Sequence, residues 1–185
     1  HPCQSLADWL TLDEHHIGRR AHLVLSWAYH PKALPMAVPN STLLMACQRG
    51  MQVTLLRPEG YSLDPDIIAR AHALSKASGG AFEESDNPEA ALADARVVYA
   101  KSWGSLALYG DSTGEKVLRD RYADWCVGSA KLPVNVNAHF MHCLPVRRDV
   151  VASAALISGK QSLVRDQAEN RKWAQCAVLR KMVEA

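Results

Sequence analysis

His22-Leu-Val-Leu-Ser-Trp27 is the clearest of several short apolar runs along the chain. A run of this length is too short for a typical helix, and near-continuous apolar character is typical of a strand that is covered on both faces of a sheet. The same pattern predicts four further strands, at Met51–Leu56, Ala95–Ala100, Ala138–His142 and Ser162–Arg165. The sequence therefore predicts a buried sheet.

Segments with helical period or composition separate these strands. We predict helices over Val38–Gly50, Asp64–Ser78, Pro88–Asp94, Glu115–Trp125 and Asp166–Val183. Asp64 and Asn87 each precede a proline, as an N-cap precedes the first helical residue, and Gly50 and Gly79 suit helix ends. The alternation indicates parallel β-α-β units. We expect an α/β, three-layer Rossmann-like domain with a mainly parallel sheet over residues 17–185, preceded by a leading helix over residues 1–16.

Composition narrows the class of protein. The 185 residues suit one domain, and Lys+Arg 21 against Asp+Glu 19 gives no basic stripe of the kind that binds nucleic acid. The apolar stretch Leu23–Tyr29 is far shorter than the roughly 20 residues of a membrane helix. The five cysteines have no paired spacing, and no secretory signal precedes them, so we expect a cytoplasmic protein. Because the chain begins at His1 without methionine, we expect a fragment.

The loops that follow the strands are where chemistry is expected, because parallel sheets bind ligands at the carboxyl ends of their strands. Neither G-x-G-x-x-G nor G-x-x-x-x-G-K-[ST] occurs, so we expect no nucleotide cofactor. His15-His16 and His142-Cys143 lack the ligand spacing of structural zinc sites, so we expect no metal. A small-molecule ligand remains the favoured partner.

Three motifs carry the residues suited to such a ligand: His1-Pro-Cys-Gln4, Lys101-Ser-Trp-Gly104 and His142-Cys-Leu-Pro145. His1 and Gln4 are spaced i and i+3, so they can face one ligand from a helix. The turn at Cys143-Leu-Pro145 leaves backbone carbonyls free to accept hydrogen bonds. Cys143 could instead be a nucleophile, but its neighbour His142 should point to the opposite face. The non-functional alternative for His1 and Gln4 is that they are helix-cap and surface polar residues.

Together with Glu169-Asn-Arg171, these motifs resemble the aspartate/ornithine carbamoyltransferase family, in its C-terminal, ornithine-binding half. The resemblance implies that the H-P-x-Q and H-C-L-P segments converge on carbamoyl phosphate and that an S-x-G loop closes over the amino acid. It implies a catalytic role for His1, Gln4 and Arg171. It implies substrate-binding roles for Lys101, Ser102, Trp103, Cys143 and Leu144.

The resemblance also implies partners. Family members form homotrimers and carry an N-terminal carbamoyl phosphate domain with an S-x-R-T-R loop, which this sequence lacks. We therefore expect the chain to be inactive alone.

The acceptor is expected to be an N-acylated ornithine. Ordinary ornithine carbamoyltransferases have an aspartate four residues before the loop serine, where this chain has Val98, which cannot neutralise a free α-ammonium. Lys101 is suited to a carboxylate. Val151 replaces the lysine that some acetylornithine enzymes carboxylate, which favours the succinyl branch or a looser acceptor. The alternatives are a non-catalytic amino-acid-binding module and, less favoured, an ordinary ornithine carbamoyltransferase.

Overall fold

The sheet determines where the functional loops lie. A computed structural model describes residues 1–184, and within them the sheet has five strands, all parallel, in the order β3-β2-β1-β4-β5. The strands are β1 (His22–Trp27), β2 (Gln52–Leu56), β3 (Ala81–Ser85), β4 (Val97–Lys101) and β5 (His139–Met141). The predicted α/β, Rossmann-like class is confirmed.

Strand β1 occupies the centre of the sheet. It pairs with β2 on one side and with β4 on the other, so that Val24 lies level with Thr54 and Val98. From Leu23 to Trp27 every residue is buried. This continuous burial explains why β1 has the clearest apolar run in the sequence, since a central strand has no solvent-facing side.

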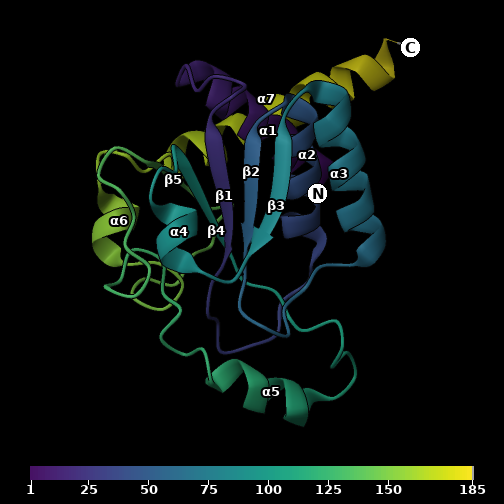
Figure 1. Ribbon diagram of the computed structural model, residues 1–185. Helices are drawn as coiled ribbons and strands as arrows, with labels where there is room; N and C mark the ends of the chain where they lie inside the picture. Colours follow the sequence, from purple (N-terminus) through teal and green to yellow (C-terminus); the bar gives the residue numbers. More distant parts are fainter. Residues whose placement is uncertain (185) are drawn as a thin grey trace.

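Helices cover both faces of the sheet (Figure 1). They are α1 (Pro2–Glu14), α2 (Ala37–Arg49), α3 (Pro65–Ser78), α4 (Pro88–Leu92), α5 (Ser112–Asp120), α6 (Ala154–Ser158) and α7 (Val164–Val183). Helices α1, α2, α3 and α7 form one layer, in which α1 packs on both α2 and α7. Helix α4 lies on the opposite face, as a right-handed crossover from β3 back across the sheet to β4 requires.

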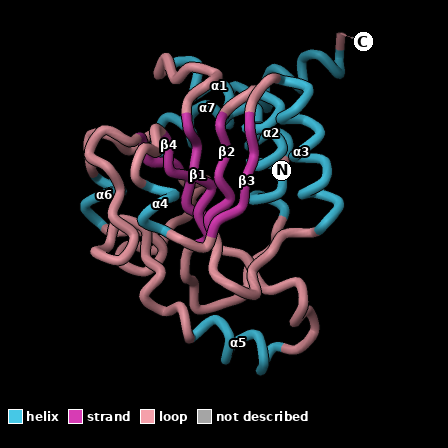
Figure 2. The backbone as a smooth tube through the Cα atoms, viewed as in Figure 1, coloured by secondary structure: helices cyan, strands magenta, loops and turns pink. Residues whose placement is uncertain are grey.

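Helix α5 lies apart from both layers. Figure 2 shows it beyond the carboxyl ends of the strands, reached through long loops. The predicted helix over Glu115–Trp125 is shifted, because the Asp111 side chain caps α5 at the Gly114 backbone N–H and the helix ends at Asp120. The loops between β4 and β5 therefore carry an additional helical segment above the ligand edge of the sheet.

The predicted helix ends are confirmed at four positions. Asp64 caps α3 by accepting from the Asp66 backbone N–H at 2.8 Å, and Asn87 caps α4 by accepting from Ala90. Gly50 and Gly79 end α2 and α3 in the left-handed conformation, with φ of 84° and 71°. Glycine is suited to both positions because it has no Cβ to clash there.

One predicted element was wrong, and two observed elements were not predicted. Ser162–Arg165 is not a strand: Ser162 makes a single bridge to Phe140, and α7 begins at Val164. Conversely, β3 has no signal in the sequence, because Ala81–Ser85 is an edge strand without a buried residue and includes Glu83 and Glu84. A strand with one free edge and polar side chains lacks the apolar run on which the prediction relied. Helix α6 was also missed.

The proposed division into residues 1–16 and 17–185 stays a prediction, and α1 packs closely against α7 across it. Over residues 1–184, no helix is both long enough and apolar enough to cross a membrane.

Candidate active site at the carboxyl edge of the sheet

The carboxyl ends of β1, β4 and β5 meet at one edge of the sheet, as parallel pairing requires (Figure 1). The Lys101–Gly104 segment follows β4, and the His142–Pro145 segment follows β5. Two of the three sequence motifs therefore lie side by side. The third, His1–Gln4, begins helix α1, which packs against α7.

A buried polar network joins the first motif to the last. Gln4 Nε2 donates to Asp8 Oδ1 at 2.7 Å, and Gln167 Nε2 donates to the same oxygen at 2.9 Å. Tyr99 Oη donates to Asp8 Oδ2 at 3.1 Å. The side-chain Oε1 of Gln167 then accepts a hydrogen bond from the backbone N–H of His142 at 2.9 Å. Through four hydrogen bonds, α1, β4, α7 and the H-C-L turn are linked.

Burial controls the ionisation of this network. Asp8 is fully buried, and the loss of contact with water raises its pKa to about 6. Hydrogen bonds from Gln167, Gln4 and Tyr99 and the charge of Arg171 have the opposite, smaller effect. Burial and the Asp8 charge raise the pKa of Tyr99 well above its ordinary value. Asp8 is therefore a carboxylate at pH 7, and Tyr99 remains a hydrogen-bond donor.

The H-C-L turn presents backbone to the ligand edge. Leu144 has φ of 43° and is followed by a cis bond to Pro145. The Leu144 backbone N–H donates to Nδ1 of His142 at 3.0 Å. A leucine in the left-handed region is uncommon and persists where surrounding contacts hold it. The turn is consistent with the prediction that its backbone carbonyls accept hydrogen bonds.

His142 and Cys143 are both held neutral. Burial, together with the nearby charge of Lys101, lowers the pKa of His142 to about 3. Burial raises the pKa of the Cys143 thiol, although Lys101 opposes that shift. A thiol with a raised pKa is a poor nucleophile at pH 7, and His142 is already bonded to Leu144. This supports a binding role for Cys143.

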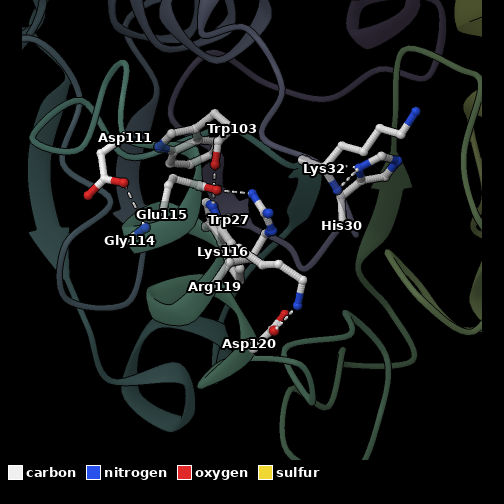
Figure 3. Close-up of polar contacts among 10 residues, drawn as sticks. All are labelled: Trp27, His30, Lys32, Trp103, Asp111, Gly114, Glu115, Lys116, Arg119 and Asp120. Carbon is white, nitrogen blue, oxygen red and sulfur yellow. Dashed lines mark hydrogen bonds and ion pairs between the residues drawn. The ribbon is translucent and has the colours of Figure 1, made fainter.

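The Lys101–Gly104 segment buries two of its side chains; Figure 3 shows one of them, Trp103, against Trp27. Trp103 is 1% exposed, its indole N–H donates to the Tyr61 carbonyl at 2.9 Å, and its own carbonyl accepts from the Trp27 indole. Ser102 is also buried, with its hydroxyl 3.4 Å from the Tyr29 carbonyl oxygen. Of the predicted substrate-binding residues in this segment, Lys101 alone keeps a partly exposed side chain. The Trp103 indole is occupied inside the core.

Helix α5 adds a buried ion pair beside this segment. Arg119 donates to Glu115 one turn earlier, and both side chains are buried (Figure 3). A cavity of about 680 Å³ lies against them. Its lining comes from residues of the segments 33–36 and 104–112 and from the pair itself. The cavity does not include Lys101, Ser102 or Trp103.

The remaining residues singled out by the sequence are His1, Gln4, Arg171 and Val98, and they differ in burial. His1 is exposed at the start of α1, whereas Gln4 is buried, so the two do not share one exposed face. Arg171 is half-buried on α7, near enough to Asp8 to lower its pKa. Val98 is fully buried within β4 and pairs with Phe140, so it lies below the edge that the loops form. Val98 therefore bears on the choice of acceptor through its motif position alone.

Sequence reasoning missed three residues of the network: Asp8, Tyr99 and Gln167. A signal existed for Asp8, which follows Gln4 by four residues and therefore faces the same side of α1. No comparable signal pointed to Gln167, because its partner His142 is distant in sequence and contributes only its backbone. Within residues 1–184, no three His, Cys, Asp or Glu side chains are grouped to hold a metal ion.

The parallel sheet, with polar groups gathered at its carboxyl edge, defines a Rossmann-like ligand-binding domain. Residues 36–182 match the model of the aspartate/ornithine carbamoyltransferase family, Asp/Orn binding domain. The chain belongs to this family. Among curated relatives, it is 43% identical to N-acetylornithine carbamoyltransferase of Xanthomonas campestris, over 99% of this chain and 55% of the relative. It is 38% identical to N-succinylornithine carbamoyltransferase of Bacteroides fragilis, over 100% and 53%.

Solved structures give the same result. The chain superposes on acetylornithine transcarbamylase complexed with acetylcitrulline with a TM-score of 0.92 and 42% identity, covering 97% of this chain and 55% of that one. The chain therefore spans about half the length of the relatives it matches.

Proposed function

We propose that this chain is the acceptor-binding half of a carbamoyltransferase, and that the acceptor is the side-chain amine of an N-acylated ornithine. The observation that carries the proposal is the hydrogen-bonded path from Gln4 through Asp8 and Gln167 to the His142 backbone N–H. It joins the H-P-C-Q and H-C-L segments, although 137 residues lie between Gln4 and His142 in the sequence. Two segments so joined can act on one small ligand.

The reaction needs few protein groups. The amine attacks the carbonyl carbon of carbamoyl phosphate and a C–N bond forms. The C–O bond to phosphate breaks with its electron pair leaving on phosphate, and the proton that the amine loses passes to the departing phosphate. Negative charge develops on the carbonyl oxygen, and donors aimed at that oxygen lower the barrier most. His1 and Arg171 are the proposed donors, and Gln4 is proposed to bind the carbamoyl group beside them.

The H-C-L turn has the complementary task. The carbonyl oxygens of Cys143 and Leu144 are proposed to accept from the carbamoyl NH2 and from the attacking amine, which fixes the direction of attack. Because burial raises the pKa of the Cys143 thiol, the thiol does not compete with the amine as a nucleophile. Only positioning is then required of this turn.

Lys101 is the proposed partner of the acceptor's carboxylate, with Ser102 and Trp103 supporting its loop. Identity falls from 43% for an N-acetylornithine enzyme to 38% for an N-succinylornithine enzyme and 35% for an ornithine carbamoyltransferase of Vibrio. This order supports an acylated acceptor. The carbamoyl phosphate contacts that this chain does not supply are proposed to come from the remaining half of the family's length and from a homotrimer.

Calorimetry of this chain with N-acetylornithine, N-succinylornithine and ornithine tests the acceptor. We expect both acylated forms to bind more tightly than free ornithine, because the domain provides a cation for a carboxylate and no carboxylate for an ammonium at position 98. Tightest binding of free ornithine would overturn the acceptor assignment. Binding of the acceptors without carbamoyl transfer in the protein's complete natural form would instead indicate a non-catalytic binding module.

A further inference from the structure

Asp8 lies at the crossing point of the buried network and has no role in the reaction described above. Its carboxylate is fully buried between α1, α7 and β4, and it accepts from Gln4, Gln167 and Tyr99. A structural interface has no need of a buried carboxylate, since a packed apolar residue avoids the cost of removing a charge from water. The position of Asp8 therefore invites a functional explanation.

The direction of every hydrogen bond around Asp8 is determined. The His142 backbone N–H can only donate, so the amide oxygen of Gln167 must face it and the amide nitrogen must face Asp8. An ionised carboxylate can only accept, so Gln4 must also turn its amide nitrogen toward Asp8. The carbonyl oxygen of Gln4 is then the end of that amide that is turned away from Asp8.

We propose that Asp8 is a positioning residue of the carbamoyl site: it fixes the Gln4 amide so that its carbonyl oxygen accepts from the carbamoyl NH2, and it anchors the H-C-L turn through Gln167. This rests on the proposed function, because it assumes that Gln4 contacts the carbamoyl group. Gln4 then accepts a hydrogen bond from the NH2 of the carbamoyl group, while His1 and Arg171 donate to its carbonyl oxygen.

The surroundings of Asp8 are consistent with this role. The ionisable groups around it are Arg171 from α7, Tyr99 from β4 and the thiol of Cys143 after β5. Arg171 stabilises the ionised form, whereas burial favours the neutral one. The carboxylate, with its fixed acceptor oxygens, is thus present at pH 7 and becomes protonated as the pH falls through about 6.

The first experiment examines the network without a ligand. In NMR spectra of the 185-residue chain, the side-chain NH2 signals of Gln4 and Gln167 should shift together with a single titration near pH 6, that of Asp8. Asp8→Leu should remove this shared titration. If the chemical shifts of the Gln4 NH2 group change neither with this titration nor with the substitution, the proposal is overturned, whatever the function of the chain.

The second experiment compares two ligands that differ only in the recognised group. Carbamoyl phosphate carries an NH2 where acetyl phosphate carries a methyl group, so an acceptor oxygen on Gln4 should favour carbamoyl phosphate by about tenfold, the effect of one hydrogen bond. Affinities follow from ligand-induced NMR shifts. Asp8→Leu should bring this ratio close to one. Asp8→Asn should keep most of it, because the asparagine oxygen can still accept from Gln4.

Thr11→Val is the matched control. Thr11 lies three residues further along α1, and its hydroxyl accepts from Asn170 of α7 at 3.0 Å, so the substitution disturbs the same helix pair without touching Gln4. It should leave the ratio unchanged. If Asp8→Leu does not fold, Asp8→Ala replaces it, because that change also removes the oxygen that accepts from the Gln4 amide.

The outcomes separate the two proposals. An unmodified chain that does not prefer carbamoyl phosphate would contradict the proposed function of Gln4. A clear preference that survives Asp8→Leu, or survives Asp8→Ala, would leave the function intact and overturn the positioning role of Asp8.

Discussion

The ends of strands β4 and β5 lie next to each other, yet they use their motif residues in opposite ways. After β4, the side chains of Ser102 and Trp103 turn inward and bond to backbone carbonyls of the core. After β5, the His142 side chain holds the backbone of Leu144, whose own side chain remains exposed. One strand end is therefore built mainly for stability, and the other presents backbone to the ligand edge. A sequence motif contains both residues that stabilise the core and residues that face the ligand, and the motif alone does not distinguish them.

Trp103→Ala has the largest expected effect and tests whether the end of β4 serves mainly the stability of the fold. Removing a fully buried indole should lower the free energy of unfolding by about 3–5 kcal/mol, as measured by urea denaturation. Tyr109→Ala, at a residue 91% exposed in the same loop, is the control and should change it by less than about 0.5 kcal/mol. Loss of ligand binding by Trp103→Ala at unchanged stability would show that Trp103 serves the ligand and not the fold.

The pH dependence of stability tests Asp8, whose carboxylate is linked to the β5 end through Gln167. Because burial raises the folded-state pKa of Asp8 from 3.8 to about 6, the folded protein binds this proton more tightly than the unfolded chain does. The contribution of Asp8 to stability is thus fully present below pH 3.8 and is lost as the pH rises through about 6, by about 3 kcal/mol.

Asp8→Asn removes this titration, so the difference in unfolding free energy between the variant and the unmodified chain should grow in favour of the variant from pH 4 to pH 7. Denaturation curves at several pH values measure it. Parallel pH profiles for the two proteins would show that the Asp8 carboxylate is not held at a raised pKa.

Lys101→Met tests the one side chain of the β4 end that remains available to a ligand. Loss of a charged hydrogen bond should weaken the binding of N-acetylornithine by about 1.5–3 kcal/mol in calorimetry. Lys131→Met is the control, because Lys131 pairs with Asp124 on a separate loop. Equal affinities of the Lys101 variant and the unmodified chain would remove Lys101 from the site.

The smallest expected effect concerns the backbone of the β5 end. Leu144 has a left-handed φ of 43°, so Leu144→Gly should relieve about 1 kcal/mol of backbone strain and should not lower the free energy of unfolding. Leu106→Gly is a matched control, since Leu106 is 40% exposed against 39% for Leu144 and is not among the residues with positive φ. It should destabilise by about 1 kcal/mol. Equal losses for both variants would contradict a strained turn.

The sequence predicted the parts of the fold that depend on local pattern. Buried strands such as β1 and helix caps such as Asp64 have signals within a few residues. The edge strand β3 has none, because its exposed glutamates follow no apolar pattern. Ser162–Arg165 has the composition of a strand, but only Ser162 pairs with β5 before α7 begins.

In the candidate site, too, only features with a local sequence pattern could be predicted. Its motifs could be found from the order of residues, whereas the inward turn of Trp103 depends on Tyr61, and the role of Gln167 depends on a backbone group in a different segment. Contacts between distant segments cannot be inferred from spacing.

A crystal structure of this chain with N-acetylnorvaline, an unreactive analogue that lacks the side-chain amine, would show whether the ends of β4 and β5 bind one ligand together. We expect the carboxylate of the ligand to bind Lys101 and its side chain to point toward the backbone carbonyls of Cys143 and Leu144, so that both strand ends contact one molecule. A ligand held only in the cavity beside Glu115 and Arg119, without contact to Lys101 or the H-C-L turn, would contradict it.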